Sequence, residues 1–371
     1  MINPILKNKT LHNILVKIAD KNYAGTVQKM VNHIFNSPKI LQLHINTQGN
    51  FNCEYCYINN RNVETLSLSE IFDLIDQAKK LGIKFIDLLG GEPFMHPNFL
   101  EIIQYIYKKG VYVTIFTNGS FLNIEFLHNL KPFKNFLTLV VKYDHKKSYS
   151  KQTNTRNLFK KIKKNIKKYT DEGFKVITFT VVTQKNINHI NDIIKESIGL
   201  GALPMFERYM PVKDSKTNHL LEIKKEEWAD VLDQVYELYK PYRAVIKGLA
   251  FLKGGVCSCY QNSICVTADG YILPCPETPF ELNLGNVKEK PLKKIWKDSS
   301  SIRNNWNKIP LECSHCKSKY LCRGGCKAYT YIKNKEFNKK DPLCNADIPS
   351  TYTHCVYSLV RIFNKDKLIK Q

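Results

Sequence analysis

The sequence predicts an α/β protein with a parallel sheet, followed by a cysteine-rich extension. Apolar strands alternate with amphipathic helices between about residues 40 and 208, the pattern of a parallel sheet with right-handed crossovers. Six such units can form an open or partial barrel. Ten of the twelve cysteines lie between Cys257 and Cys355, which separates a metal-rich C-terminal third from the rest.

Each element is marked by its hydrophobic periodicity and its end signals. The expected strands cover residues 40–46, 83–89, 111–116, 136–142, 174–182 and 203–208. The expected helices cover residues 70–82, 98–109, 122–130, 156–171, 188–199 and 222–240. Ligands bind at the carboxyl ends of parallel strands. Three unusual segments fall there in succession: 48–57 with its two cysteines, Gly90-Gly91-Glu92, and Thr117-Asn118-Gly119. They predict one shared site.

Composition narrows the class of protein. The net charge is +23, yet only seven of the 56 basic residues are arginine, the residue favoured for bidentate phosphate recognition. The charge is therefore interpreted as a lysine-rich surface, with attraction of an acidic ligand or peptide as the alternative, and no nucleic-acid partner is expected. No apolar stretch approaches the roughly 20 residues of a membrane span, and the N-terminus lacks a signal core. We expect a cytoplasmic protein without a membrane partner.

The chain divides into five expected segments. Residues 1–36 form a helical segment, 37–210 the barrel, 211–250 a helical bridge, 251–346 the cysteine-rich domain and 347–371 a C-terminal helix or tail.

The cysteine spacings point to metal ligation, because disulfides are rare in a reducing compartment. Cys313-x2-Cys316-x5-Cys322-x3-Cys326 is a dense array, with further cysteines on both sides. On count alone, zinc and iron–sulfur sites both fit. The pair Cys53-x2-Cys56 fits a redox dithiol, half of a zinc site or part of an iron–sulfur site.

Together these residues resemble radical SAM enzymes that carry a SPASM domain. The resemblance covers roughly residues 38–346 and implies a partial (β/α)6 TIM-like barrel, [4Fe–4S] clusters and S-adenosylmethionine. Cys53, Tyr55 and Cys56 match the end of the family's Cys-x3-Cys-x-aromatic-Cys loop, with Tyr55 near the adenine. By the same resemblance, Gly90, Gly91 and Glu92 bind the methionine amino group. Thr117 and Asn118 are expected to add cofactor contacts.

The resemblance also assigns two auxiliary clusters. The inner cluster would use Cys259, Cys265, Cys275 and Cys326, with Cys257 competing for the place of Cys259. The outer cluster would use Cys313, Cys316, Cys322 and Cys344. Cys355 has no role in the family pattern and is expected to be a buried thiol.

The first cysteine of the barrel loop should be residue 49, which is glycine. Two thiolates leave two irons of a cluster without protein ligands. Three explanations stay open: an inactivating substitution, a naturally degenerate family member, or a site completed by an exogenous thiol or another residue. His44 lies on the first strand, so we interpret it as a histidine of the sheet face.

The resemblance implies an enzyme that modifies a peptide or protein side chain through a 5′-deoxyadenosyl radical, with flavodoxin or ferredoxin as electron donor. Alternatives are a small-molecule or tetrapyrrole-modifying relative and a non-catalytic iron–sulfur protein for electron transfer or binding. Possible catalytic residues are Glu277, which follows Cys275-Pro276, and Lys142 and Asp144 at the end of the fourth strand.

Overall fold

A computed structural model describes residues 37–58, 64–121, 124–212, 218–243, 246, 257, 259–345 and 348–354. The expected helical segment 1–36, most of the tail 347–371 and Cys355 lie outside these residues. The described chain divides into two units. One combines residues 37–222 with 263–300, and the other takes its described residues from 223–262 and 301–371.

The sheet of the first unit is built around β1 (Ile40–His44), which pairs in parallel with a strand on each side. Its order is β6-β5-β4-β3-β2-β1-β7-β8. The remaining strands are β2 (Phe85–Leu89), β3 (Tyr112–Thr117), β4 (Leu137–Lys142), β5 (Lys175–Val182), β6 (Leu203–Arg208), β7 (Ser263–Val266) and β8 (Ile272–Leu273). All pairings from β6 to β7 are parallel, and β8 is antiparallel to β7.

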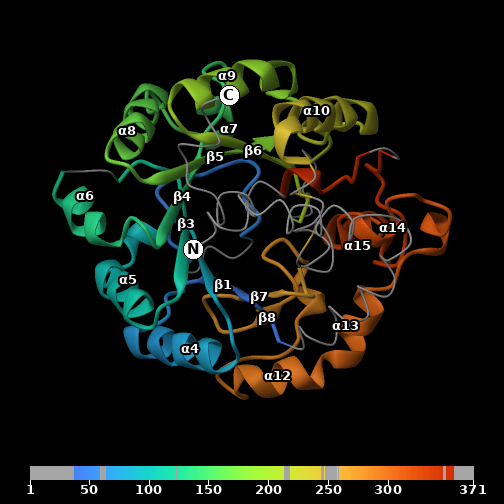
Figure 1. Ribbon diagram of the computed structural model, residues 1–371, viewed down its shortest axis with the longest axis horizontal. Helices are drawn as coiled ribbons and strands as arrows, with labels where there is room; N and C mark the ends of the chain where they lie inside the picture. Colours follow the sequence, from blue (N-terminus) through green and yellow to red (C-terminus); the bar gives the residue numbers. More distant parts are fainter. Residues whose placement is uncertain are drawn as a thin grey trace. The chain divides into compact units, whose positions relative to one another are not determined.

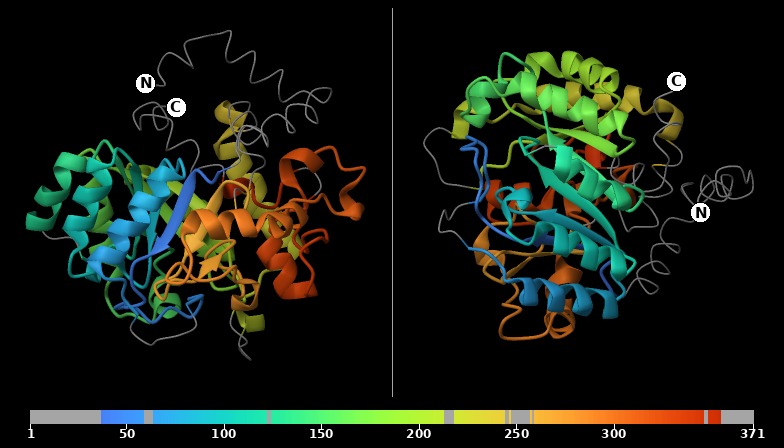
Figure 2. Two further views of the ribbon diagram at one scale, coloured as in Figure 1. Left: turned by 90° about the horizontal axis from the view of Figure 1, so that it is seen from below. Right: turned by 90° about the vertical axis from the view of Figure 1, so that its left-hand side faces the viewer.

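Helices line the outer side of this sheet (Figure 1). They are α4 (Leu68–Lys80), α5 (Phe99–Lys108), α6 (Ile124–Leu130), α8 (Phe159–Asp171), α9 (Ile190–Gly199) and α12 (Leu292–Asp298), with the short α7 (Tyr149–Thr153) after β4. In the right-hand view of Figure 2, the blue helix α4 lies below the strands and the green helices α8 and α9 lie above them.

Local sequence explains where these helices begin and what they bury. Ser67 forms a capping box with Glu70, which satisfies backbone donors at the start of α4. The lysine-rich α8 buries Ile162 and Ile166 and leaves its lysines outward, as its spacing predicts. All six expected strands and the six expected helices are confirmed to within a few residues at each end. The partial-barrel fold class is also confirmed, and β7 and β8 extend the sheet beyond the expected six strands.

The second unit contains α10 (Lys225–Leu238), most of α13 (Ser300–Trp306), α14 (Lys319–Cys322) and α15 (Lys327–Asn334). Trp228 of α10 is fully buried and its Nε1 donates to the Ser350 carbonyl at 3.0 Å. Trp306 packs edge-on against Tyr260. The expected cysteine-rich range 251–346 is thus shared between the units, because 263–300 belongs with the barrel strands.

None of the helices in the described residues combines the length and apolar character that crossing a membrane requires.

Candidate functional site

The two barrel cysteines lie on one turn after β1. The Cys56 N–H donates to the Cys53 carbonyl at 3.2 Å, so the two residues belong to a single tight loop. Burial raises the pKa of the Cys53 thiol to about 11, against the opposing influence of the Tyr55 hydroxyl and the Lys142 charge. A metal takes the thiolate form, so Lys142 favours the state of Cys53 that binds iron.

Gly49 lies beside the second loop of the site. A Cβ atom added to it would meet Gly91 C at 3.3 Å and Gly91 Cα at 3.4 Å, and its φ lies outside the left-handed region. The backbone therefore does not require glycine here. A Cβ atom at residue 49 requires a shift of a few tenths of an ångström from the Gly91 backbone.

Gly90 and Gly91 are required for close contact between two backbone segments. Gly90 has φ +153°, and a Cβ atom on Gly91 would lie 2.1 Å from the Gln48 carbonyl oxygen. The Gly91 N–H donates to Asn46 O at 3.1 Å, and the Glu92 N–H donates to Gln48 O at 2.7 Å. These glycines thus hold the loop after β2 against the loop that carries the cysteines.

Glu92 joins the ends of β2 and β3. Its fully buried carboxylate accepts from Thr117 Oγ1 at 2.8 Å, from the Asn118 N–H at 2.7 Å and from the Phe94 N–H at 3.2 Å. Burial raises the pKa of Glu92 to about 7, although all three donors favour the ionised form. Three bonds leave a carboxylate room for roughly one more donor. The expected role toward an amino group stays a prediction.

The loops after β1 and β3 are joined as well. Asn118 Nδ2 donates to Asn50 Oδ1 at 2.7 Å, and Asn50 Nδ2 donates to Ser120 Oγ at 3.0 Å. The structure therefore brings together the three segments that the sequence placed at one end of the sheet.

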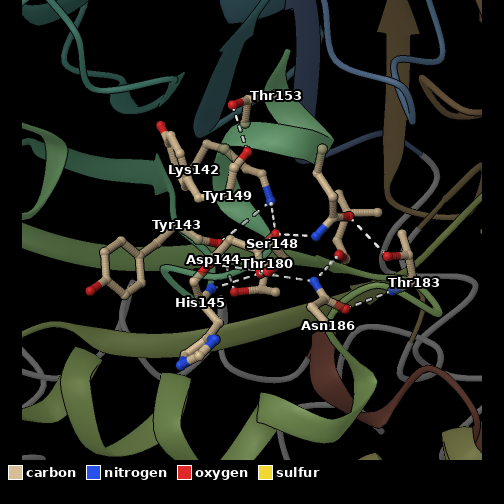
Figure 3. Close-up of polar contacts among 12 residues, drawn as sticks. Lys142, Tyr143, Asp144, His145, Ser148, Tyr149, Thr153, Thr180, Thr183 and Asn186 are labelled. Carbon is tan, nitrogen blue, oxygen red and sulfur yellow. Dashed lines mark hydrogen bonds and ion pairs between the residues drawn. The ribbon is translucent and has the colours of Figure 1, made fainter. Parts of the chain in front are cut away.

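Lys142 and Asp144 form a buried ion pair beside this loop (Figure 3). Their Nζ and Oδ2 atoms are 3.5 Å apart, and Asp144 is fully buried. Lys142 Nζ also lies 4.7 Å from the centre of the Tyr55 ring. Desolvation lowers the pKa of Lys142, opposed by the charges of Asp144 and Cys53. The pair places an ammonium group next to the cysteine loop.

Asp144 is held in place by polar side chains that no sequence pattern indicated. Its Oδ1 accepts from Ser148 Oγ at 2.9 Å and from Asn186 Nδ2 at 3.0 Å. Gln152 Nε2 donates to Oδ2, and the Gln152 carbonyl accepts from the Glu54 N–H at 3.0 Å. These residues lie up to 42 positions from Asp144 in the chain, so only the fold could reveal the network.

Glu277 lies near the loop that carries Cys53 and Cys56, because its charge acts on Tyr57 of that loop. Desolvation is the largest cause that raises the pKa of the half-buried Tyr57 phenol. The charges of Cys265, Glu277, Cys56 and Cys275 raise it further. Tyr57 is thus close both to a barrel cysteine and to two cysteines of the extension within one unit.

His44 is buried within the same unit. Its Nε2 is 3.5 Å from the Tyr57 hydroxyl, and burial lowers the pKa of His44 to about 4. The ring is therefore neutral over the ordinary pH range and pairs with the phenol.

His145 turns away from Asp144 (Figure 3) and stacks on His189 at 3.9 Å, with Asp192 nearby. Two imidazoles and a carboxylate are a possible ligand set. However, the Lys147 N–H donates to His145 Nδ1, which leaves the proton of the neutral ring on Nε2, the atom that faces Asp192. A metal-binding histidine donates from its second nitrogen instead. We assign no metal to this group.

Gly270 explains the spacing before Cys275. Its φ is +93° and its N–H donates to Thr267 O at 2.9 Å, so it closes the turn between β7 and β8. The turn sets Cys265 of β7 and Cys275 close enough for the charge of one to raise the pKa of the other. Both thiols are buried.

Four further cysteines converge in the second unit. The charge of Cys344 acts on Cys313 and Cys322, and that of Cys316 acts on Cys344. Cys313 and Cys322 lie on short helices, and the N–H groups of Cys316 and Cys344 each donate to the carbonyl three positions earlier. This is the set that the resemblance assigned to the outer cluster.

Asp341 is a positioning residue that the sequence did not single out. Its buried carboxylate accepts from the Cys326 N–H at 2.8 Å, the Leu343 N–H at 2.9 Å and Ser350 Oγ at 2.6 Å. The Cys344 N–H donates to its carbonyl at 2.9 Å. Asp341 thereby ties the segment carrying Cys344 to Cys326.

The cysteines expected to form the inner cluster are divided between the units. Cys265 and Cys275 belong to the barrel unit, and Cys257, Cys259 and Cys326 belong to the other. Cys257 interacts with Cys259 and with His354, and these contacts lower its pKa well below the usual value. The choice between Cys257 and Cys259 stays a prediction.

The outer cysteine set and the barrel loop differ in how many of a cluster's ligands they supply. The outer set offers four converging thiols, which matches the four-cysteine ligation of an iron–sulfur cluster. The barrel loop offers two thiols and a glycine, so it lacks the third ligand of a complete radical SAM cluster. The fold and these sites define an iron–sulfur protein built on a partial α/β barrel.

Comparisons with known proteins identify the class more closely. Residues 45–196 match the radical SAM superfamily, and residues 257–317 match the SPASM iron-sulfur cluster-binding domain. The antilisterial bacteriocin subtilosin biosynthesis protein AlbA of Bacillus subtilis is 25% identical over 91% of this chain and 76% of its own length. The AdoMet-dependent heme synthase of Methanosarcina barkeri is 22% identical over 83% of this chain and 97% of its own.

A solved structure agrees in fold. Streptococcus suis SuiB bound to the precursor peptide SuiA aligns with a TM-score of 0.65 at 18% identity, covering 86% of this chain and 78% of SuiB. The chain belongs to the radical SAM enzymes with a C-terminal SPASM domain, whose cofactors are iron–sulfur clusters and S-adenosylmethionine.

Proposed function

We propose that the chain modifies a peptide or protein side chain, using the radical that the family generates from S-adenosylmethionine once the barrel site has its third ligand. The observation that carries the proposal is the joined set of loops after β1, β2 and β3. Hydrogen bonds from Glu92 and Asn118 hold the cysteine loop, the glycine segment and the end of β3 in one place.

The substrate class is supported by relatives of two kinds. SuiB has been solved with a precursor peptide, and AlbA serves the biosynthesis of a bacteriocin. Both cover most of this chain. Carried over to this chain, they favour a peptide substrate.

The chain's own residues would shape the site around the substrate. Lys142 presents a buried ammonium at the cysteine loop, held by Asp144, and so can attract a carboxylate or an acidic side chain. Glu277 is close enough to Tyr57 for its charge to act on the phenol, and Cys56 acts on the same phenol. It is the candidate base for removing a proton from the reacting substrate. An external one-electron donor such as flavodoxin or ferredoxin and a cytoplasmic location complete the proposal.

The test uses a short peptide encoded beside the gene, coexpressed with the full chain or with its Gly49→Cys variant. We expect a mass change in the peptide with Gly49→Cys, and loss of that change when Glu277→Gln is added. If Gly49→Cys produces 5′-deoxyadenosine but leaves every such peptide unaltered, a peptide substrate is the wrong assignment.

A tetrapyrrole substrate is the second candidate, because the heme synthase matches along almost its whole length. Incubation of the reconstituted Gly49→Cys protein with a tetrapyrrole carboxylic acid and a reductant decides between them. Loss of a carboxyl group from the tetrapyrrole, with no change in the peptide, favours this second candidate.

A non-catalytic electron-transfer protein is the third candidate, and Gly49 is the observation behind it. It predicts assembled auxiliary clusters and no 5′-deoxyadenosine from either the native chain or Gly49→Cys.

A further inference from the structure

Two cationic side chains are buried inside the cysteine array of the second unit. Arg323, directly after Cys322, is 8% exposed, and Lys327, directly after Cys326, is 7% exposed. Arg323 has φ +54° and is followed by two glycines that also have positive φ. This tight reversal places both cations within the segment that carries the cysteines.

Thiols and a backbone carbonyl surround the Lys327 ammonium. Lys327 Nζ donates to the Lys308 carbonyl at 3.1 Å, and the thiols of Cys313 and Cys322 are the first negative groups to act on it. Arg323 is close enough to act on Lys327 as a like charge. Within the described residues, the buried Arg323 Nε has no hydrogen-bond partner.

No carboxylate forms an ion pair with either cation in the part of the chain that the structure describes. Asp341 is the buried carboxylate of this segment, and it accepts hydrogen bonds from two backbone N–H groups and from Ser350 Oγ. Two neighbouring cations without a counter-charge are costly to bury. A group of opposite charge is therefore required between them and the thiols.

An iron–sulfur cluster ligated by four thiolates meets this requirement. Such a cluster is anionic, and its sulfurs accept hydrogen bonds from N–H donors. The free Nε–H of Arg323 and the ammonium of Lys327 are donors and positive charges at the same place. The site thus contains the matching charge for the cluster as well as its ligands.

We propose that Arg323 and Lys327 are the counter-charges of the outer auxiliary cluster and raise its reduction potential. The proposal rests on the assignment of Cys313, Cys316, Cys322 and Cys344 to that cluster. Reduction adds an electron to an already anionic group, and a nearby positive charge favours the reduced state. The outer cluster is then more readily reduced than it would be without these two charges.

The experiment measures reduction potentials in protein reconstituted without oxygen. Cys53→Ala and Cys56→Ala are introduced together to remove the barrel thiols, so that only auxiliary clusters contribute. Redox titration followed by electron paramagnetic resonance then compares Lys327→Gln and Lys327→Arg. Lys333→Gln is the matched control, because Lys333 lies on the same helix but is exposed.

In Lys327→Gln we expect the reduction equilibrium of one cluster to shift about tenfold toward the oxidised form. For one electron, this is a fall of about 59 mV in its reduction potential. Lys327→Arg and Lys333→Gln should keep the native potential, and Arg323→Gln should lower the same potential as Lys327→Gln. If Lys327→Gln loses iron while Lys327→Arg keeps it, the counter-charge role is supported as well.

Two results would overturn the proposal. Normal iron content with unchanged potentials in Lys327→Gln and Arg323→Gln refutes the counter-charge role alone. Loss of iron in both Lys327→Gln and Lys327→Arg shows that the residue acts by packing. Absence of iron from the native protein instead refutes the cluster assignment itself, which keeps the two failures distinct.

Discussion

Restoring a thiol at residue 49 should complete the barrel site without harming the fold. The nearest atoms to a new Cβ are Gly91 C at 3.3 Å, Gly91 Cα at 3.4 Å and Gly91 O at 3.6 Å. The required shift is a few tenths of an ångström. Replacing glycine also removes conformational freedom from the unfolded chain, worth about 0.4–1 kcal/mol. We expect Gly49→Cys to change the free energy of unfolding by no more than about 1 kcal/mol.

The gain in iron is the main readout. Two auxiliary clusters account for about eight irons and a third cluster for about four more. We expect Gly49→Cys, reconstituted without oxygen, to gain about four irons over the native chain. It should also release 5′-deoxyadenosine from S-adenosylmethionine when a reductant is present.

Gly49→Ala is the matched control, because it adds the same Cβ without the thiol. It should fold like Gly49→Cys and gain neither iron nor 5′-deoxyadenosine release. The reasoning fails if Gly49→Cys folds normally and still holds no more iron than Gly49→Ala. Strong destabilisation of Gly49→Cys would also contradict the prediction, because it would mean that Gly91 cannot shift enough to accept a Cβ atom at residue 49.

Three further outcomes follow from the contacts. Gly91→Ala should destabilise the protein by at least about 2 kcal/mol, because its Cβ would lie 2.1 Å from a carbonyl oxygen. Gly199→Ala is the control: its Cβ would have nothing within 4 Å, so the change should be neutral or stabilising. Thermal unfolding of the two variants compares them. The folded pKa of Glu92, about 7, exceeds the ordinary 4.5, so its contribution is most favourable below pH 4.5 and is lost as pH rises to 7. Relative to Glu92→Gln, the native chain should therefore lose about 2–3 kcal/mol between pH 5 and 8 in urea unfolding, and a constant difference contradicts the burial argument. Asp341→Ala leaves two buried N–H donors unpaired, so its free energy of unfolding should fall by about 2–4 kcal/mol and its iron content by about four irons. Full iron content in this variant would show that Asp341 does not position Cys344.

Periodic patterns and spacings were sufficient for the sheet, its helices and the order of the site segments. The alternation of apolar strands and amphipathic helices is a local property, and it predicted β1 to β6 and the helices α4, α5, α6, α8, α9 and α10 with small errors at the ends. The short helix α7 was not predicted. Gly90-Gly91-Glu92 and the cysteine spacings are equally local. They predicted where a site would form because parallel strands end at the same edge.

The short strands β7 and β8 had no comparable signal. Each has four residues or fewer, and β7 is defined by its pairing with β1, more than 200 positions earlier in the chain. A two-residue periodicity cannot be detected over so short a run, so only the tertiary structure placed them.

By itself, the sequence determined the fold class, the candidate ligands and the glycine that takes the place of the first barrel cysteine. The tertiary structure decided what these ligands are surrounded by. It showed that a Cβ atom at residue 49 needs a shift of only a few tenths of an ångström, and that Glu92 is held by donors at the end of β3. It also showed that Arg323 and Lys327 are buried beside the cysteines. These properties depend on contacts between residues far apart in the chain, and such contacts leave no periodic trace in the sequence.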